Sequence, residues 1–140
     1  MSNQRNIIVI GGGAAGMIAA IAAAKEGCAV SLYEKNEKLG KKIFITGKGR
    51  CNVTNAGDMD ELFAAVITNK KFMFSSFYGF TNEDMMQFLE DAGLRLKTER
   101  GKRVFPLSDH SSDVIAALER TLKKENVKVY LRKEVKGLNF

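Results

Sequence analysis

One stretch, residues 7–34, limits what this chain can fold into more than any other part of its 140 residues. It reads as an apolar strand, a glycine-rich turn, an alanine-rich helix and a second strand that ends on an acid. Gly11, Gly13 and Gly16 form a G-x-G-x-x-G pattern. Glu34 follows eighteen residues after the last of these glycines. This order is typical of a βαβ unit that binds a dinucleotide.

Each part of the pattern has a physical reason. Gly11 allows a tight turn out of the strand, Gly13 lets a pyrophosphate approach the backbone, and Gly16 lets the helix lie close to the sheet. The helix that follows offers free N–H groups and a partial positive charge to phosphates. Glu34 can accept hydrogen bonds from a ribose 2′-hydroxyl and would repel a 2′-phosphate.

An N-terminal membrane or secretion segment is the alternative interpretation, because residues 7–24 carry no charge. This run is rich in glycine and alanine, contains no leucine, and has a turn-forming GGG at its centre. It also leads directly into a β-type run that ends on Glu34. We therefore favour nucleotide binding over a targeting segment.

Composition limits the class of protein. A hydrophobic content of 45% over 140 residues suits one globular domain, and no later segment is long and apolar enough to span a membrane. Cys28 and Cys51 form no C-x-x-C pair, which favours a reduced, cytoplasmic protein. His110 is the single histidine, and no acid or thiol cluster has metal-ligand spacing, so no metal site is expected.

The net charge of +6 raises the question of nucleic-acid binding. The basic residues gather in residues 35–50 and 95–103, and neither segment carries an aromatic-interleaved binding motif. A solvated face or a pocket for an anionic cofactor explains the excess charge, and nucleic-acid binding stays the lesser alternative.

The remaining patterns predict the other elements. Asn6–Ile10 and Ala29–Tyr33 are expected as strands, joined by a helix at residues 14–26. A long loop is expected at 35–55. Further helices are expected at residues 58–67, 70–77, 81–93 and 111–125. A hairpin is expected from 94–98 and 103–105, and the last strands at 127–131 and 134–138.

Local signals refine three of these helices. Asp58 can cap the first, and Thr81 with Asp84 resembles a capping box for the third. Ser111 or Ser112 is expected to cap the last helix. The inward positions of that last helix are expected to be Val114, Ala117, Leu118, Thr121 and Leu122.

A second motif lies at residues 41–55, which read KKIFITGKGRCNVTN. Its glycines can bring backbone N–H groups close to a flat or phosphorylated ligand, and Arg50 can pair with phosphate. The alternative is a tight turn whose side chains satisfy one another. Cys51 could be a reactive thiol beside Arg50, but it has no partner cysteine nearby. We favour a small buried packing residue.

Together, the two motifs resemble the flavoprotein family of aminoacetone-oxidase-like and BaiN-like NAD(P)/FAD-dependent oxidoreductases. The pattern of that family is GGGAAG, then an acid, then G-[RK]-K, TG-x-GRCN-x-TN and RVFP. The matching positions here are residues 11–16, Glu34, and residues 40–42, 46–55 and 103–106. The resemblance covers nearly the whole chain, and the GRCN-x-TN segment is its most specific part.

The resemblance implies an α/β fold, a Rossmann-like FAD-binding βαβ domain of the glutathione-reductase type, and FAD rather than NAD as the cofactor. The glycines and the helix start would hold the pyrophosphate, Glu34 the adenosine ribose, and Lys42 the AMP half. Residues 47–54 would approach the flavin, and the backbone of Val135 would meet the adenine. The implied cofactor-binding residues are Gly11, Gly13, Ala14, Ala15, Gly16, Glu34, Lys35, Lys42, Gly47, Gly49, Arg50, Cys51, Asn52, Thr54 and Val135. No catalytic residue is assigned, and His110 is expected at the surface.

Members of this family are longer than 140 residues. They insert a substrate domain and return with a C-terminal FAD segment, so residues 1–140 are expected to be the N-terminal part of an incomplete domain. Its sheet would hold three strands, with an unpaired edge and exposed apolar surface.

Two functions follow. The first is the FAD-binding portion of a flavin-dependent oxidoreductase, which transfers hydride or electrons between a small organic substrate and oxygen or NAD(P). The alternative is a non-catalytic nucleotide-binding module, or a half-domain that a partner completes. A flavin enzyme that acts on tRNA is a weaker idea, suggested by net charge alone.

Overall fold

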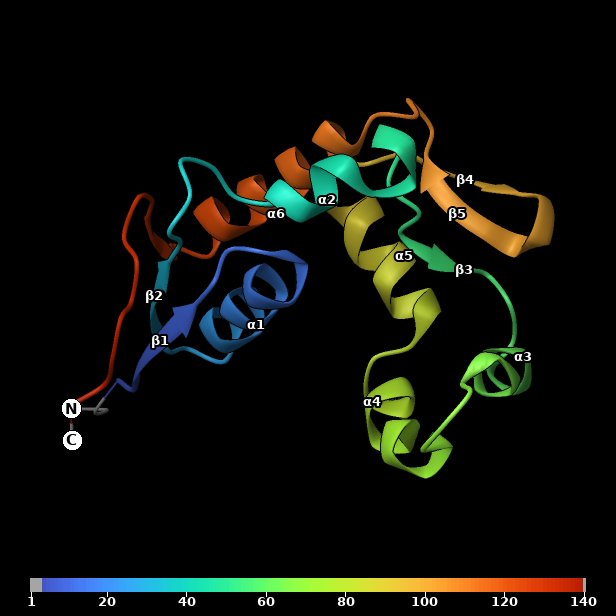
Figure 1. Cartoon of the computed structure of the whole chain (residues 1–140), viewed down its shortest axis with the longest axis horizontal. Coiled ribbons are helices and arrows are strands. Elements are labelled where there is room, and N and C mark those ends of the chain that lie inside the picture. The colour runs from blue at the N-terminus through green and yellow to red at the C-terminus, as the bar shows by residue number, and fades with distance from the viewer. Residues whose placement is uncertain (1–3, 140) are drawn as a thin grey trace.

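The computed structural model describes residues 4–139 and arranges them around two small sheets at opposite sides of the molecule (Figure 1). In the first sheet, β1 (Asn6–Ile10), β2 (Ala29–Tyr33) and β6 (Lys128–Tyr130) run parallel in the order β1-β2-β6. Helix α1 (Ala14–Lys25) joins β1 to β2 and completes the predicted βαβ unit. The predicted bounds of β1 and β2 are confirmed, and β6 is shorter at both ends than predicted.

The main core lies between one face of this sheet and the helices α1 and α6 (Ser111–Lys124). Leu32 of β2 is buried in the same cluster as Met17 of α1 and Leu118 of α6. The predicted inward positions of α6 are all buried. Burial of these apolar side chains is the main term that holds the helices on the sheet.

The opposite face of the sheet is open. Ile8 and Ile10 of β1 are 64% and 54% exposed. Tyr33 stacks on Tyr130 across the neighbouring strands, with ring centroids 4.8 Å apart. β1 is an edge strand of the described sheet. The expected exposed apolar surface and sheet edge are therefore present in this structure.

The predicted strand at residues 134–138 is wrong, since the chain after β6 joins no sheet. It follows the loop after β2 instead. The N–H of Arg132 donates to the carbonyl of Asn36, and the N–H of Lys133 donates to the carbonyl of Glu34, each at 2.9 Å. These two bonds hold the tail beside the carboxyl end of β2 without a strand ladder.

The predicted loop at 35–55 is also wrong in part, because it contains helix α2 (Lys41–Ile45), the 3-10 turn η1 (Thr46–Gly49) and the short strand β3 (Thr54–Asn55). The N–H of Gly40 donates to the carbonyl of Gly12 at 2.8 Å, directly before α2 begins. Ile43 then buries its side chain in the core. This tertiary contact stabilises a helix too short to form alone.

The second sheet is antiparallel, in the order β3-β5-β4. The predicted hairpin is confirmed as β4 (Leu96–Glu99) and β5 (Arg103–Pro106), joined by η3 (Arg100–Lys102). The remaining elements are helical. They are α3 (Met59–Ala65), η2 (Lys70–Met73), α4 (Phe74–Gly79) and α5 (Asn82–Asp91).

Helix caps agree with the sequence at two helices and differ at a third. Asp58 caps α3, and Thr81 forms a capping box with Asp84 on α5. The expected cap of α6 by Ser111 or Ser112 is wrong, because Ser111 is the first residue of that helix. Its hydroxyl donates instead to the carbonyl of Phe44 at 2.9 Å, which ties α6 to α2. Within residues 4–139, no helix is long and apolar enough to cross a membrane.

Candidate nucleotide-binding site

The turn between β1 and α1 requires glycine at two of the predicted positions. Gly11 has a φ of +100°, a region that side chains disfavour, and its N–H donates to the carbonyl of Tyr33 at 2.8 Å. A Cβ on Gly16 would lie 1.8 Å from the carbonyl oxygen of Gly11. The backbone turn and the close approach of helix to strand thus explain both residues.

The start of α1 is left without a side-chain cap. Its N-cap is Gly13, no side chain of the described residues bonds to it, and its first turn holds no acid. A Cβ on Gly13 would meet nothing within 4 Å. The N-cap side chains of α3 and α5 each accept an N–H of their helix, whereas no N-cap side chain does so at α1. Such an end favours an anion.

The carboxylate of Glu34 lies directly beside this turn. It accepts the N–H of Gly12 at 2.6 Å, the N–H of Asn36 at 2.8 Å and the side-chain amide of Asn36 at 2.6 Å. Burial would by itself raise the pKa of Glu34, which is only 7% exposed. The N–H donors and the charge of Lys35 outweigh burial and hold the pKa below its ordinary value of 4.5.

This shift predicts how acid destabilises the turn. Because the folded pKa of Glu34 is lowered, its ionised form contributes stability that is present above pH 4.5 and is lost as the pH falls through the folded pKa. Glu34→Gln is expected to lower the free energy of unfolding at neutral pH, since one amide edge then offers a donor to an N–H. The deficit relative to the wild type should close as the pH falls, measured by urea unfolding across the acid range. The exposed Glu119→Gln serves as the control, and a deficit that does not depend on pH would contradict the prediction.

Two hollows share Glu34 and Asn36 in their lining. The first has a volume of about 340 Å³, and the second of about 330 Å³. Residues that line the first are Ile10, Gly11, Tyr33, Glu34, Lys35, Asn36, Lys133, Glu134 and Val135. Residues that line the second are Gly12, Gly13, Glu34, Asn36, Lys41, Lys42 and Ile45.

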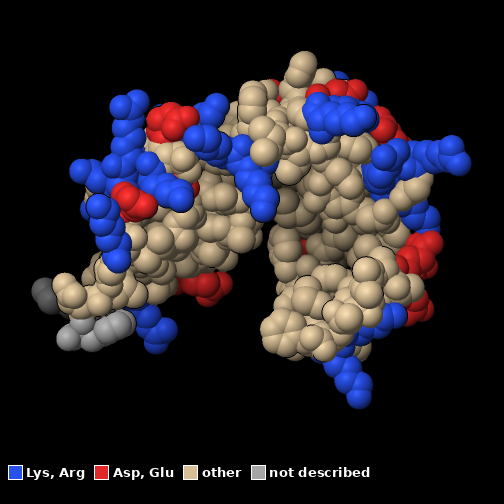
Figure 2. All heavy atoms as spheres, in the orientation of Figure 1, with Lys and Arg blue, Asp and Glu red and all other residues tan. Residues whose placement is uncertain are grey.

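The hollows bring together six predicted site residues from distant parts of the sequence. They are Gly11, Gly13, Glu34, Lys35, Lys42 and Val135. Asn36 and Lys41 were not predicted from the sequence. An asparagine two residues after an acid can fold back on it, which is the signal that could have identified Asn36. Basic side chains gather over this end of the molecule, at the left in Figure 2.

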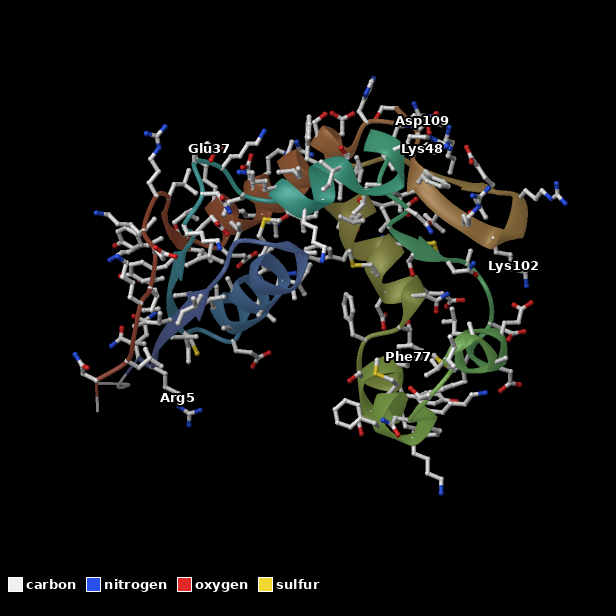
Figure 3. The ribbon with its side chains drawn as sticks, in the orientation of Figure 1. Arg5, Glu37, Lys48, Phe77, Lys102 and Asp109 are labelled. Carbon is white, nitrogen blue, oxygen red and sulfur yellow. The ribbon has the colours of Figure 1, made fainter. Side chains whose placement is uncertain are left out.

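The second group of predicted residues, from Gly47 to Thr54, lies at the other end of α2 and lines neither hollow. Figure 3 shows this separation, with Glu37 labelled near the first group and Lys48 and Asp109 near the second. The structure therefore forms two clusters of candidate residues, which α2 connects.

The backbone of the second cluster is unusual. Gly47, Lys48, Gly49 and Cys51 all have φ values between +56° and +83°. Cys51 is buried, and burial raises the pKa of its thiol. These observations support the packing role expected for Cys51. Non-glycine residues held in this conformation often mark functional segments.

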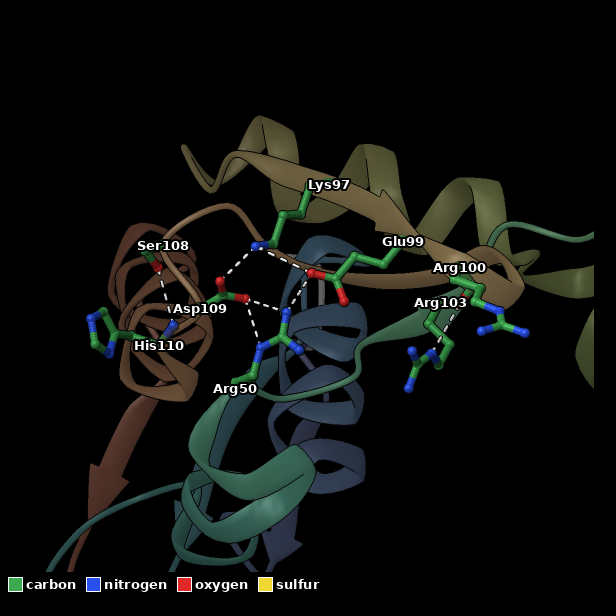
Figure 4. Close-up of polar contacts among 8 residues, drawn as sticks. All are labelled: Arg50, Lys97, Glu99, Arg100, Arg103, Ser108, Asp109 and His110. Carbon is green, nitrogen blue, oxygen red and sulfur yellow. Dashed lines mark hydrogen bonds and ion pairs between the residues drawn. The ribbon is translucent and has the colours of Figure 1, made fainter.

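The polar side chains of the second cluster face the β4–β5 hairpin. Arg50 Nε donates to Asp109 Oδ1 at 2.8 Å, and Arg50 Nη2 lies 2.5 Å from Glu99 Oε1 (Figure 4). The guanidinium also lies over the ring of Phe105, 4.2 Å from its centroid. Thr54 pairs with Val104 between β3 and β5. A phosphate contact by Arg50 stays a prediction, because its partners here are two carboxylates and an aromatic ring.

Possible metal ligands do not cluster among residues 4–139. In the part of the chain that the structure describes, no three His, Cys, Asp or Glu side chains could hold a metal ion together. His110 is exposed, as expected. Ala14 and Ala15 are also exposed, in the first turn of α1.

The fold and the turn define a Rossmann-type nucleotide-binding protein. Residues 5–140 match the family described as HI0933-like protein Rossmann domain, and the chain belongs to this family. The expected family and α/β fold class are confirmed. The expectation that the chain corresponds to the Rossmann portion of flavin-dependent oxidoreductases is also confirmed.

Two curated relatives match almost the whole chain. A 3-dehydro-bile acid delta(4,6)-reductase of Clostridium scindens is 37% identical over 98% of this chain. A ribosomal RNA dihydrouridine synthase of Haemophilus influenzae is 29% identical over 96% of it. The chain covers 33% of each, so it spans about a third of the length of these relatives.

Solved structures support the fold. The 3-ketosteroid-delta4-(5alpha)-dehydrogenase of Rhodococcus jostii aligns with a TM-score of 0.65 over 94% of this chain and 39% of that protein. The sequence identity is 14%, so this likeness concerns the fold alone.

Proposed function

We propose that this chain binds FAD, with the adenosine and pyrophosphate half in the two hollows beside Glu34 and the flavin end toward residues 46–55. The observation that carries this proposal is the uncapped N-terminus of α1 at Gly13, which opens on a hollow lined by Lys41 and Lys42. Helix N–H groups and two lysine side chains beside an open glycine suit a pyrophosphate.

The residues present fit the rest of this half of the cofactor. Glu34 is the sole acid that lines the second hollow, and N–H donors already surround its carboxylate. A ribose hydroxyl can bind beside it, and a 2′-phosphate would be repelled. The tail places Val135 at the first hollow, where its backbone can meet an adenine. FAD and NAD share this half, and membership of the flavoprotein family favours FAD.

FAD, when bound, supplies reversible acceptance of a hydride or of single electrons. The residues of this chain would bind and orient it. In the whole protein, we propose that the flavin exchanges electrons with NAD(P)H or with oxygen. We also place the protein in a reducing, cytoplasmic setting, which the two free cysteines support.

The substrate class of the whole protein is part of the proposal. One relative is named as a delta(4,6)-reductase and the other as a dihydrouridine synthase. Both names denote the addition of hydrogen across a ring double bond. We therefore propose a cyclic substrate whose carbon–carbon double bond is conjugated with a carbonyl group. Mass spectrometry should find the saturated ring after reaction of the whole protein, and a protein that only desaturates rings would contradict this class.

Titration of the chain with FAD tests the cofactor assignment. Saturable quenching of flavin fluorescence is expected, with competition by ADP and weaker competition by an adenine dinucleotide that carries a 2′-phosphate. A chain that leaves the flavin spectrum unchanged at saturating FAD would refute the proposal. Equal affinity for ADP and FAD would support the alternative, a non-catalytic nucleotide-binding module. Salt-dependent binding of a ribosomal RNA fragment would point to an RNA substrate.

A further inference from the structure

We propose that Asp109 is a positioning residue that acts through Arg50 and fixes the turn at residues 46–52 for the uncharged ring system of the flavin. The proposal rests on the proposed function, since it assigns a role to the second cluster of that site. Asp109, Lys97 and Glu99 lie outside the sequence motifs that predicted the site.

Asp109 holds Arg50 by a fork of two contacts. Asp109 Oδ1 lies 2.8 Å from Nε of the guanidinium and 2.6 Å from Nη2. Both contacts are made to one carboxylate oxygen, and together they restrict rotation of the guanidinium more than a single contact would. Phe105 packs against one face of that plane. The side chain of Arg50 is thus fixed in both direction and rotation.

Lys97 closes this arrangement into a ring of four charges. Its ammonium lies 2.6 Å from Asp109 Oδ2 and 3.3 Å from Glu99 Oε1, and Glu99 in turn contacts Arg50 (Figure 4). The ring joins three segments that are distant in sequence: the turn at 46–52, strand β4, and the loop after β5.

The exposure of these side chains indicates what the ring does. All four are 26% to 39% exposed, and ion pairs at such sites add little to global stability. Their geometry nevertheless determines where the turn lies relative to the hairpin. We therefore expect substitutions in the ring to change the position of the turn and to leave the overall fold intact.

Backbone conformation at both ends of the contact supports this role. Cys51 next to Arg50 has a φ of +60°, and Asp109 itself has a φ of +61°. Non-glycine residues adopt this conformation at an energetic cost and keep it only where surrounding contacts hold them. The contact between Asp109 and Arg50 links Asp109 to the residue that precedes Cys51.

The charges of the ring decide which part of the ligand the turn suits. Arg50 and Lys97 carry two positive charges, and Glu99 and Asp109 carry two negative charges, so the ring as a whole is neutral. Within the ring each cation is matched by a carboxylate, and the exposed Lys48 adds one further positive charge to the same turn. With Arg50 engaged in the ring, the two glycines of the turn can offer backbone N–H and C=O groups to the polar edge of a flat, uncharged ring.

Asp109→Asn tests the proposal in the full chain, with FAD and ADP as separate probes. The wild type should bind FAD more tightly than ADP. The variant should weaken FAD binding about tenfold, since a loose turn must be ordered on binding, and should leave ADP binding unchanged. The visible spectrum of bound FAD should shift toward that of free FAD. Asp109→Glu should restore part of the affinity, and the nearby Asp113→Asn, outside the ring, should match the wild type.

Three results would overturn the inference, and they differ from one another. A variant that keeps the wild-type preference for FAD and the wild-type spectrum shows that Asp109 does not position the turn. Equal weakening of FAD and ADP binding shows a general loss of structure. A wild type that binds no FAD refutes the proposed function itself, and the inference falls with it.

Discussion

Gly16→Ala is expected to destabilise the chain by about 3 kcal/mol or more. The added methyl group would lie 1.8 Å from the carbonyl oxygen of Gly11, which is a backbone atom and cannot rotate away. Relief requires α1 to move off β1, and this movement opens the core around Met17. Urea unfolding followed by circular dichroism measures the loss directly.

Gly79→Ala provides the matched control for this substitution. A Cβ on Gly79 would meet nothing within 4 Å, and the residue lies at the exposed end of α4. The same chemical change should therefore be nearly neutral there. Equal stability of the Gly16→Ala chain and the Gly79→Ala chain would show that the close approach of α1 to β1 is not required.

Gly13→Ala is expected to leave the fold intact and to weaken FAD binding at least tenfold, or about 1.4 kcal/mol. A Cβ at this position contacts no atom of the chain, because it points into open space beside the hollow with Lys41 and Lys42. The methyl group would occupy the space proposed for the pyrophosphate. Titration with FAD and with ADP should reveal the same loss for both ligands.

The pair Gly13 and Gly16 separates binding from folding. Gly13→Ala should weaken FAD binding without lowering the free energy of unfolding. Gly16→Ala should lower the free energy of unfolding. Gly13→Ala that unfolds the chain, or that binds FAD as well as the wild type, would contradict the site proposed here.

Local sequence signals predicted the βαβ unit well. The strands β1 and β2, the capping box at Thr81 and the buried face of α6 each depend on neighbouring residues or on a repeat within one element. The G-x-G-x-x-G spacing also predicted the turn, because each glycine meets a steric requirement of the connection between strand and helix. Such features can be read from a single sequence because the information is contiguous.

Features set by distant contacts could not be predicted in the same way. Helix α2 depends on a hydrogen bond from Gly40 to Gly12 and on burial of Ile43, and neither is visible in local propensity. Residues 134–138 were expected as a strand, yet backbone bonds of the preceding residues to Glu34 and Asn36 direct the tail along a loop. The charged ring around Arg50 joins segments up to 59 residues apart.

The bond between Gly40 and Gly12 has a consequence for affinity. Helix α2 starts at the first cluster, and the segment that follows it forms the second cluster, with Ser111 and Ile43 holding its body to the core. The two clusters therefore keep a fixed spacing before any ligand arrives. Once one half of a long ligand has bound to one cluster, the other half is held near the second cluster. Its binding is then intramolecular, at a high effective concentration. Weak contacts at either end can then add up to tight binding.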